Sequence, residues 1–301
     1  MMNVPNLIII GAQKSGTTWL HRALEKHEQF FMTKRKELNF FNHCANHEDD
    51  NAMEKYLANF DFTGNHQYVG ESTPHYMWIK KNCPPFDPEH APRTSAEFIK
   101  RVTPDAKLVM VLRNPVTRAI SAFHHHFAMG RLSSHSMIDK VDANLGLYDI
   151  GHYARHIPYW QEIFGKNLLV YLYDDLERDS VLFLSNIFND LDVDDKSDEL
   201  GNLFATRKIN NRHSILTHKK KQQSTDFPSV SRDQIQDMIK IFDGDISYVE
   251  NLLSRDLSHW RDLDSIEQST KKTTDTPAAG LKDTQTNATS VHTEQSLGKT
   301  G

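Results

Sequence analysis

A lysine, a serine and two threonines stand beside two glycines in residues 11–18, which read GAQKSGTT. The apolar run LIII precedes this stretch, and a pattern typical of a helix follows it. A loop between a buried strand and a helix directs free backbone N–H groups outward, and the helix dipole adds positive charge. Gly16 lets the backbone approach an anion closely. We therefore expect Lys14, Ser15, Gly16, Thr17 and Thr18 to bind a phosphate or a related anion.

An arginine follows a second apolar run, KLVMVL, and opens the segment RNPVTRAIS. Ser121 lies eight residues beyond Arg113, which is about two helical turns. Pro115 suits the first turn of a helix, where its missing N–H has no cost. A guanidinium can hold a phosphate through two hydrogen bonds, and a serine hydroxyl adds a donor. Arg113 and Ser121 are therefore candidate phosphate ligands.

A single carboxylate, that of Glu37, lies in the segment TKRKELNFFNH, close to Phe40 and Phe41. Apolar rings can raise the pKa of a glutamate from about 4.3 toward neutrality, which suits a general base. Histidine is the alternative base. His75 is the better placed candidate, whereas His124–His126 are expected to be surface or hydrogen-bonded residues of a helix.

Apolar runs predict four strands that could position these residues. They are Leu7–Ile10, Lys107–Leu112, Leu168–Leu172 and the shorter Tyr68–Gly70. Helical patterns lie between and after them, at Thr17–His27, Val116–Phe127, Tyr148–Phe164, Val181–Leu191 and Arg232–Leu253. This alternation predicts an α/β fold with a central, mainly parallel sheet flanked by helices. Ligands of such sheets bind at the carboxyl ends of the strands, where Lys14 and Arg113 stand.

The composition of the 301 residues is ordinary for a globular protein, with 38% hydrophobic and 25% charged residues. A formal net charge of -5 gives no global basic field for nucleic acid. The two cysteines, Cys44 and Cys83, are too few for a disulfide framework. His43 and His47 lie beside Cys44, but no second pair of Cys or His stands at ligand spacing, so no metal is expected.

The ends of the chain bear on its organisation. The first residues lack the basic region of a signal peptide, and no run approaches the roughly 20 apolar residues of a membrane span. We therefore expect a soluble, cytoplasmic protein. Residues 265–301 are rich in Thr, Ser, Lys and Asp and nearly free of large apolar residues. They are predicted to form a disordered, low-complexity tail after a single domain of residues 1–264.

The phosphate loop departs from the Walker A pattern, in which the lysine follows the second glycine. Here Lys14 precedes Gly16. GxxKSGTTWL resembles the 5′-phosphosulfate loop of the sulfotransferases that use 3′-phosphoadenosine 5′-phosphosulfate (PAPS). LRNPVTRAISAFHHH resembles their 3′-phosphate motif, in which Arg113 and Ser121 match the arginine and the serine that hold the 3′-phosphate. The resemblance covers about residues 4–263 and implies a three-layer, P-loop-type α/β fold.

The same resemblance implies roles for the reacting groups. KELNFF is similar to the KE-x-x-FF segment of heparan-type and other carbohydrate sulfotransferases, which implies that Glu37 is the base and that Lys14 stabilises the bridging oxygen of PAPS. The acceptor would then be a hydroxyl of a carbohydrate or glycolipid. Cytosolic small-molecule sulfotransferases use a histidine, so a His75 base with a steroid, phenol or lipid acceptor stays open. A small-molecule kinase is the weaker alternative.

Other positions match the family less closely. GESTPHY resembles the EKSPxY motif, but Ser72 replaces the lysine that contacts the acceptor, which argues against a glycosaminoglycan specialist. Lys208 and Arg212 lie in a basic segment at the place where the family has a loop that closes over the nucleotide. Trp19 matches a tryptophan that stacks on adenine in cytosolic relatives, with packing in the core as the alternative.

Overall fold

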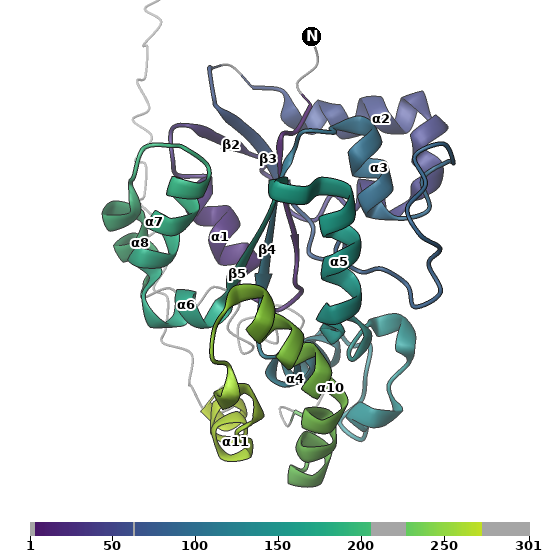
Figure 1. Cartoon of the computed structure of the whole chain (residues 1–301), viewed down its shortest axis with the longest axis vertical. Helices are drawn as coiled ribbons and strands as arrows, with labels where there is room; N and C mark the ends of the chain where they lie inside the picture. The colour runs from purple at the N-terminus through teal and green to yellow at the C-terminus, as the bar shows by residue number, and fades with distance from the viewer. Residues whose placement is uncertain (1–3, 63, 206–226, 273–301) are drawn as a thin grey trace, which may run out of the picture.

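A five-stranded sheet forms the centre of the protein, whose computed structural model describes residues 4–62, 64–205 and 227–272. Every strand is parallel to its neighbours, in the order β2-β3-β1-β4-β5 (Figure 1). The strands are β1 (Leu7–Gly11), β2 (Phe30–Met32), β3 (Tyr68–Ser72), β4 (Lys107–Leu112) and β5 (Leu168–Leu172). The predicted parallel sheet and its four strands are confirmed. The additional strand β2 has only three residues, too few to show a periodic pattern.

Helices cover both faces of the sheet. They are α1 (Thr17–Leu24), α2 (Asp50–Leu57), α3 (Ser95–Val102), α4 (Pro115–Ala128), α5 (Tyr153–Phe164), α6 (Tyr173–Arg178), α7 (Ser180–Asp190), α8 (Ser197–Ala205), α10 (Arg232–Leu253) and α11 (Leu263–Lys272). The predicted helices are confirmed, except that α1 ends at Leu24 instead of His27 and α5 begins at Tyr153 instead of Tyr148. Residues Asp149–Gly151 form a 3-10 turn there, in which Gly151 lies against the ring of Phe242. None of the described helices is long and apolar enough to cross a membrane.

The core has two halves because successive strand residues point to opposite faces. Ile8 and Ile10 of β1 pack with apolar residues of α3, α4, α5 and α10. Leu7 and Ile9 pack with residues of α1, α7 and α8. Figure 1 shows α1, α7 and α8 on one side of the sheet and α3, α5 and α10 on the other. This three-layer arrangement explains why β1 and β4 read as unbroken apolar runs.

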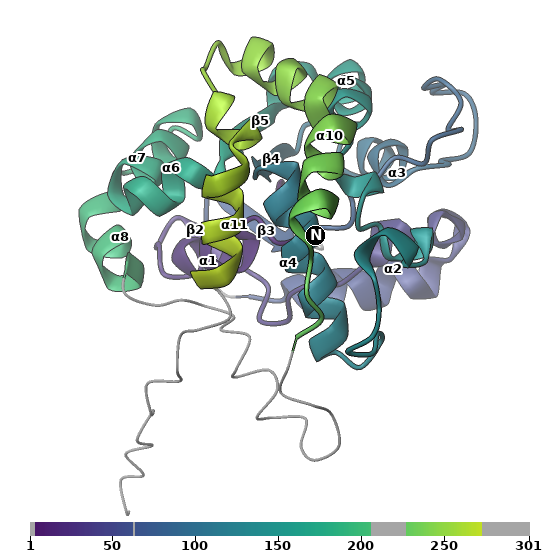
Figure 2. The same ribbon diagram turned by 90° about the horizontal axis from the view of Figure 1, so that it is seen from below.

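The folded part of the chain extends beyond the predicted boundary at residue 264. Residues 265–272, which the sequence assigns to the tail, continue helix α11. Ile266 is buried in the core, and α11 packs beside α10 and α4 (Figure 2). The expected tail is therefore corrected up to residue 272. Leu263 packs against the core together with Ile266, and Arg232 of α10 forms ion pairs with two acidic residues of α11. Residues 273–301 lie outside the described part of the chain.

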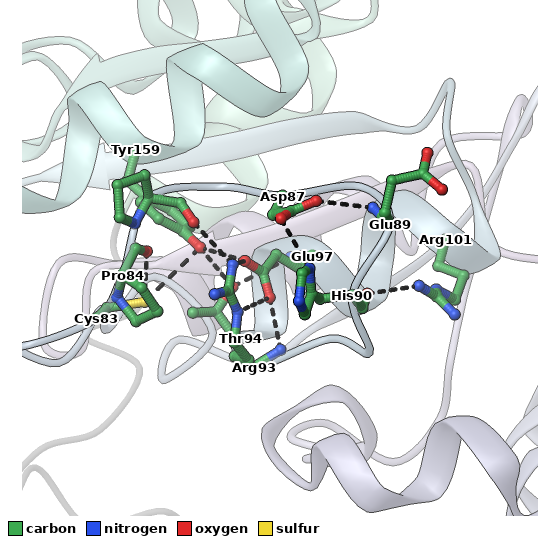
Figure 3. A network of polar contacts seen from close by, with 11 residues as sticks. Cys83, Pro84, Asp87, Glu89, His90, Arg93, Thr94, Glu97, Arg101 and Tyr159 are labelled. Carbon is green, nitrogen blue, oxygen red and sulfur yellow. Dashed lines mark hydrogen bonds and ion pairs between the residues drawn. The ribbon is translucent and has the colours of Figure 1, made fainter.

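A polar network fixes the long connection between β3 and α3 (Figure 3). Glu97 of α3 accepts hydrogen bonds from the Arg93 guanidinium at 2.8 Å and from the Tyr159 hydroxyl of α5 at 2.7 Å. The Tyr159 hydroxyl also accepts from the Cys83 thiol at 3.7 Å. The middle of this connection is thus attached to α5 through Cys83, and its end is attached to α3 through Arg93.

Candidate active site

The polar residues singled out above gather at the carboxyl ends of the strands, because parallel strands end on the same side of the sheet. This side is called the edge of the sheet below. The loop after β1 carries Lys14, and the segment after β2 carries Glu37. His75 follows β3, and Arg113 follows β4. Strands β3 and β4 pair directly with β1. The phosphate loop therefore lies centrally among the candidate catalytic groups.

The loop after β1 has the local geometry of an anion cradle. Helix α1 begins after Gly16 without a side-chain cap and without an acidic residue in its first turn, so its first N–H groups are available to an anion. The buried Ser15 hydroxyl has no hydrogen-bond partner among the described residues. A buried donor of this kind calls for a partner, and an anion held by the loop could supply one.

Gly16 is required at its position for two reasons. Its φ is 81°, in the left-handed region that favours glycine. A Cβ atom built on Gly16 would come within 2.8 Å of Leu176 Cδ2 and 3.0 Å of Tyr173 Cδ2. Helix α6 therefore packs too closely against the loop to admit a side chain there.

The Arg113 guanidinium is directed toward the phosphate loop. Its Nη1 donates to the Lys14 carbonyl at 3.1 Å, and its Nε donates to Thr117 Oγ1 at 3.1 Å. The guanidinium also lies over the Tyr173 ring, 4.8 Å from its centre. The Arg113 carbonyl accepts from the Tyr153 hydroxyl at 2.7 Å. The guanidinium is thus held beside the phosphate loop by the Lys14 carbonyl, Thr117 and the Tyr173 ring. The Tyr153 hydroxyl holds the backbone of the same residue.

Ser121 shares a face of α4 with the residue that Arg113 contacts. Thr117, Ser121 and His125 follow one another at intervals of four, so they line one side of the helix. Ser121 is buried. The side chain of Asn114 caps α4 by accepting from the amide of Val116 at 2.9 Å, which fixes where this face begins. Arg113 and Ser121 therefore extend the polar edge from the loop along α4.

Glu37 lies at the same edge, but in a more open environment than the sequence predicts. Its side chain is 51% exposed, and Lys36 Nζ lies 3.2 Å from its Oε1. The rings of Phe40 and Phe41 turn into the core and pack on Tyr56. The Glu37 carboxyl is therefore not enclosed by these rings, which pack on Tyr56 of α2 instead.

His75 lies near both the phosphate loop and Glu37. Its Nε2 is 3.5 Å from Gln13 Nε2. Burial lowers the pKa of His75, while the charge of Glu37 opposes that shift. The structure therefore brings the two candidate bases to the same part of the edge. His75 is in its neutral form at pH 7, which is the form that accepts a proton.

His124 forms a hydrogen bond with the Pro228 carbonyl at 3.0 Å, as expected of a satisfied histidine. His125 and His126 also belong to this edge, and His126 Nδ1 accepts from Arg131 at 3.0 Å. The pKa of each is lowered to about 4, and burial is the largest cause. The next cause is the positive charge of Lys14 for His125 and that of Arg131 for His126. His125 Nδ1 and His126 Nε2 are buried and have no hydrogen-bond partner among the described residues. The spacing of four from Thr117 and Ser121 to His125 is a sequence signal that could have placed it here.

The predicted nucleotide ligands Trp19, Lys208 and Arg212 have different outcomes. Trp19 is nearly buried in the core and packs edge-on against Phe183, with ring centres 6.3 Å apart. The packing thus favours the core alternative over stacking on adenine. Lys208 and Arg212 lie outside the described residues.

Within the described ranges, no group of three or more His, Cys, Asp or Glu side chains could hold a metal ion.

Comparison with known proteins identifies the family. The model of the sulfotransferase family matches residues 5–197, which is more than half of the chain. The protein therefore belongs to the sulfotransferase family, as the motifs predict.

Individual relatives match parts of the chain. A membrane-associated sulfotransferase, kil1 of Dictyostelium discoideum, is 35% identical over 127 residues, which cover 41% of this chain and 23% of that protein. Heparan sulfate glucosamine 3-O-sulfotransferase 6 of Mus musculus is 30% identical over 167 residues, which cover 53% of this chain and 44% of that protein. The chain thus spans less than half the length of these curated relatives.

A solved structure supports the fold. The crystal structure of a sulfotransferase from Alicyclobacillus acidocaldarius superposes with a TM-score of 0.64 at 23% identity. The match covers 86% of this chain and 100% of that one. The α/β architecture described above is therefore the sulfotransferase fold.

Proposed function

We propose that this protein transfers a sulfuryl group from PAPS to a hydroxyl of a carbohydrate or glycolipid. The observation that carries the proposal is the pairing of two anion-binding features at one edge of the sheet. The uncapped start of α1, with the buried Ser15 hydroxyl, offers donors to a 5′-phosphosulfate. Arg113 reaches the backbone of the same loop and offers a cation for a 3′-phosphate.

Different residues at this edge would bind the 5′ side and the 3′-phosphate of PAPS. Lys14, Ser15, Gly16, Thr17 and Thr18 would hold the 5′ side of the donor. Arg113 and Ser121 would hold its 3′-phosphate, because a guanidinium matches phosphate geometry. Since PAPS differs from common adenine nucleotides in that 3′-phosphate, this contact would decide which nucleotide binds.

The proposed chemistry needs one base and one cation. A bond forms between the acceptor oxygen and sulfur while the bond between sulfur and the bridging phosphate oxygen breaks. Glu37 would take the acceptor proton, and Lys14 would stabilise the negative charge on the departing phosphate oxygen. No metal ion is needed for either step.

The acceptor class rests on relatives and on sequence. One relative is named for heparan sulfate glucosamine, which supports a saccharide. The buried Ser72 stands where the heparan-type motif has a lysine, which favours a different saccharide or a glycolipid over heparan itself. A second candidate is a small-molecule hydroxyl with His75 as base, since burial lowers the pKa of His75 and keeps it neutral at pH 7.

Nucleotide binding measured by calorimetry tests the proposed donor. We expect 3′-phosphoadenosine 5′-phosphate to bind about 10- to 100-fold more tightly than AMP, because a charge-assisted contact is lost without the 3′-phosphate. Arg113→Ala should abolish this preference, whereas Arg178→Ala, which removes an exposed ion pair, should keep it. Equal affinity for the two nucleotides, or tighter binding of ATP, would contradict the proposal and favour a kinase.

A further inference from the structure

The segment that carries Glu37 has an unusual backbone. Glu37 and Asn39 have φ values of 62° and 58°, a region that residues with a Cβ atom rarely adopt. No regular helix or strand spans residues 33–39. Such a conformation persists only where surrounding contacts determine it.

Three hydrogen bonds from this segment supply those contacts, and all of them lead to the chain at the end of β3. The amide of Glu37 donates to the Ser72 carbonyl at 2.9 Å. The amide of Asn39 donates to Thr73 Oγ1 at 3.4 Å. The amide of Phe41 donates to the Tyr76 hydroxyl at 3.4 Å. Two of the three acceptors are therefore side-chain hydroxyls, which are free to rotate.

The direction of both hydroxyls is set by one carboxyl group, that of Glu71. Thr73 Oγ1 donates to Glu71 Oε2 at 2.8 Å, and the Tyr76 hydroxyl donates to Glu71 Oε1 at 2.8 Å. A hydroxyl has a single hydrogen. When that hydrogen points at Glu71, the lone pairs of Thr73 and Tyr76 are left for the amides of Asn39 and Phe41.

Tyr56 provides an internal contrast. Its hydroxyl also donates to Glu71 Oε1, at 3.2 Å, but none of the hydrogen bonds described for it leads on to the segment of Glu37. Its ring stacks on Phe40 with centres 4.2 Å apart. Replacing Tyr56 by Phe removes a donor to the carboxyl while the stacked ring stays.

We infer that Glu71 is a positioning residue for Glu37. Its fully buried carboxyl orients the hydroxyls of Thr73 and Tyr76 as acceptors, and these hold the segment that presents the base. The inference rests on the proposed function, in which Glu37 takes the proton of the acceptor.

Two pairs of variants test this role by steady-state kinetics. Thr73→Val keeps the shape of the side chain but removes the hydroxyl, and should lower kcat by about 10- to 100-fold, as misplacement of a reacting group does. Thr73→Ser restores the hydroxyl and should stay within about twofold of the wild type. Tyr76→Phe should lower kcat, and Tyr56→Phe should not. In all four variants the dissociation constant of 3′-phosphoadenosine 5′-phosphate should be unchanged.

Hydrogen exchange provides a readout that does not depend on activity. Amides in a peptide spanning residues 36–42 should exchange faster in Thr73→Val and Tyr76→Phe than in Thr73→Ser, Tyr56→Phe and the wild type. Equal exchange and equal kcat in Tyr76→Phe and Tyr56→Phe would overturn the inference. Absence of sulfuryl transfer by the wild type would refute the proposed function, and the exchange rates would still decide whether Glu71 orders this segment.

Discussion

Two buried glutamates, Glu71 and Glu97, accept hydrogen bonds from tyrosine hydroxyls but differ in their other partners. Glu97 forms an ion pair with Arg93 at 2.8 Å and accepts from Tyr159 (Figure 3). Glu71 accepts from three hydroxyls, and none of the hydrogen bonds or ion pairs described for it comes from an arginine or a lysine.

This difference in partners gives the two carboxyls opposite pKa shifts. Burial raises the pKa of Glu71 to about 7, and the hydrogen bonds from Thr73 and Tyr76 only partly oppose it. Burial also raises the pKa of Glu97, but the hydrogen bonds from Arg93 and Tyr159 and the charge of Arg93 together outweigh it, and the net shift is downward. The ion pair of Glu97 therefore fixes the connection between β3 and α3. The Glu71 carboxyl instead orients hydroxyl groups beside the candidate base.

The largest effect expected from this comparison lies at Glu37, the residue that the Glu71 network serves. Glu37→Gln should lower kcat for sulfuryl transfer by about 10²- to 10⁴-fold, because an amide cannot accept the acceptor proton. Affinity for 3′-phosphoadenosine 5′-phosphate should remain within about twofold. Glu54→Gln, on an exposed position of α2, is the matched control. Full activity of Glu37→Gln together with loss of activity in His75→Gln would transfer the role of base to His75.

The second largest effect is expected on the free energy of unfolding, which should respond differently to replacement of the two glutamates. Glu97→Gln should lower the free energy of unfolding by about 1–3 kcal/mol, because it leaves Arg93 without its carboxylate. Arg93 is partly exposed, which keeps the loss below that of a fully buried pair. Glu71→Gln should cost less than about 1 kcal/mol at pH 6, since an amide resembles the protonated acid. Urea unfolding measures both values, and the reverse order would contradict the comparison.

The smallest effect is the pH dependence of stability. The folded-state pKa of Glu71 lies above the ordinary 4.5, so the folded protein binds more protons between pH 4.5 and about 7. The contribution of Glu71 therefore falls as pH rises through this window. The pKa of Glu97 is lowered, so its contribution is present above pH 4.5 and is lost as pH falls below it.

Unfolding measured at several pH values checks these signs. The stability of the wild type relative to Glu71→Gln should be greater at pH 5 than at pH 7.5. Its stability relative to Glu97→Gln should be greater at pH 7.5 than at pH 3.5. Parallel pH profiles for the two differences would show that Arg93 does not distinguish the two carboxyls.

The same comparison shows what the sequence could predict. Lys14 and Arg113 follow long apolar strands, and their neighbours have the spacing of a loop and a capped helix, so local pattern sufficed to place them. Glu71 stands inside the short run YVGES and accepts a hydrogen bond from Tyr56, fifteen residues away. No periodic pattern predicts that this carboxyl is buried or that one of its partners comes from helix α2.

The errors in prediction have the same origin. The sequence places Phe40 and Phe41 beside Glu37, but both rings are drawn to Tyr56 in the core. For Trp19 the sequence left two alternatives open, and only its place on α1, which turns it toward Phe183, favours packing in the core. In each case the sequence gives the neighbourhood of a residue along the chain, while the direction of its side chain depends on tertiary packing.

The central claim is that this edge of the sheet moves a sulfuryl group from PAPS to a hydroxyl. The most direct test is to incubate the protein with PAPS labelled in its sulfate and a panel of saccharides and glycolipids, and to detect labelled product by mass spectrometry. The account predicts a labelled saccharide or glycolipid with the wild type and greatly reduced label with Glu37→Gln. Absence of label on every hydroxyl acceptor, or equal labelling by the two proteins, would contradict it.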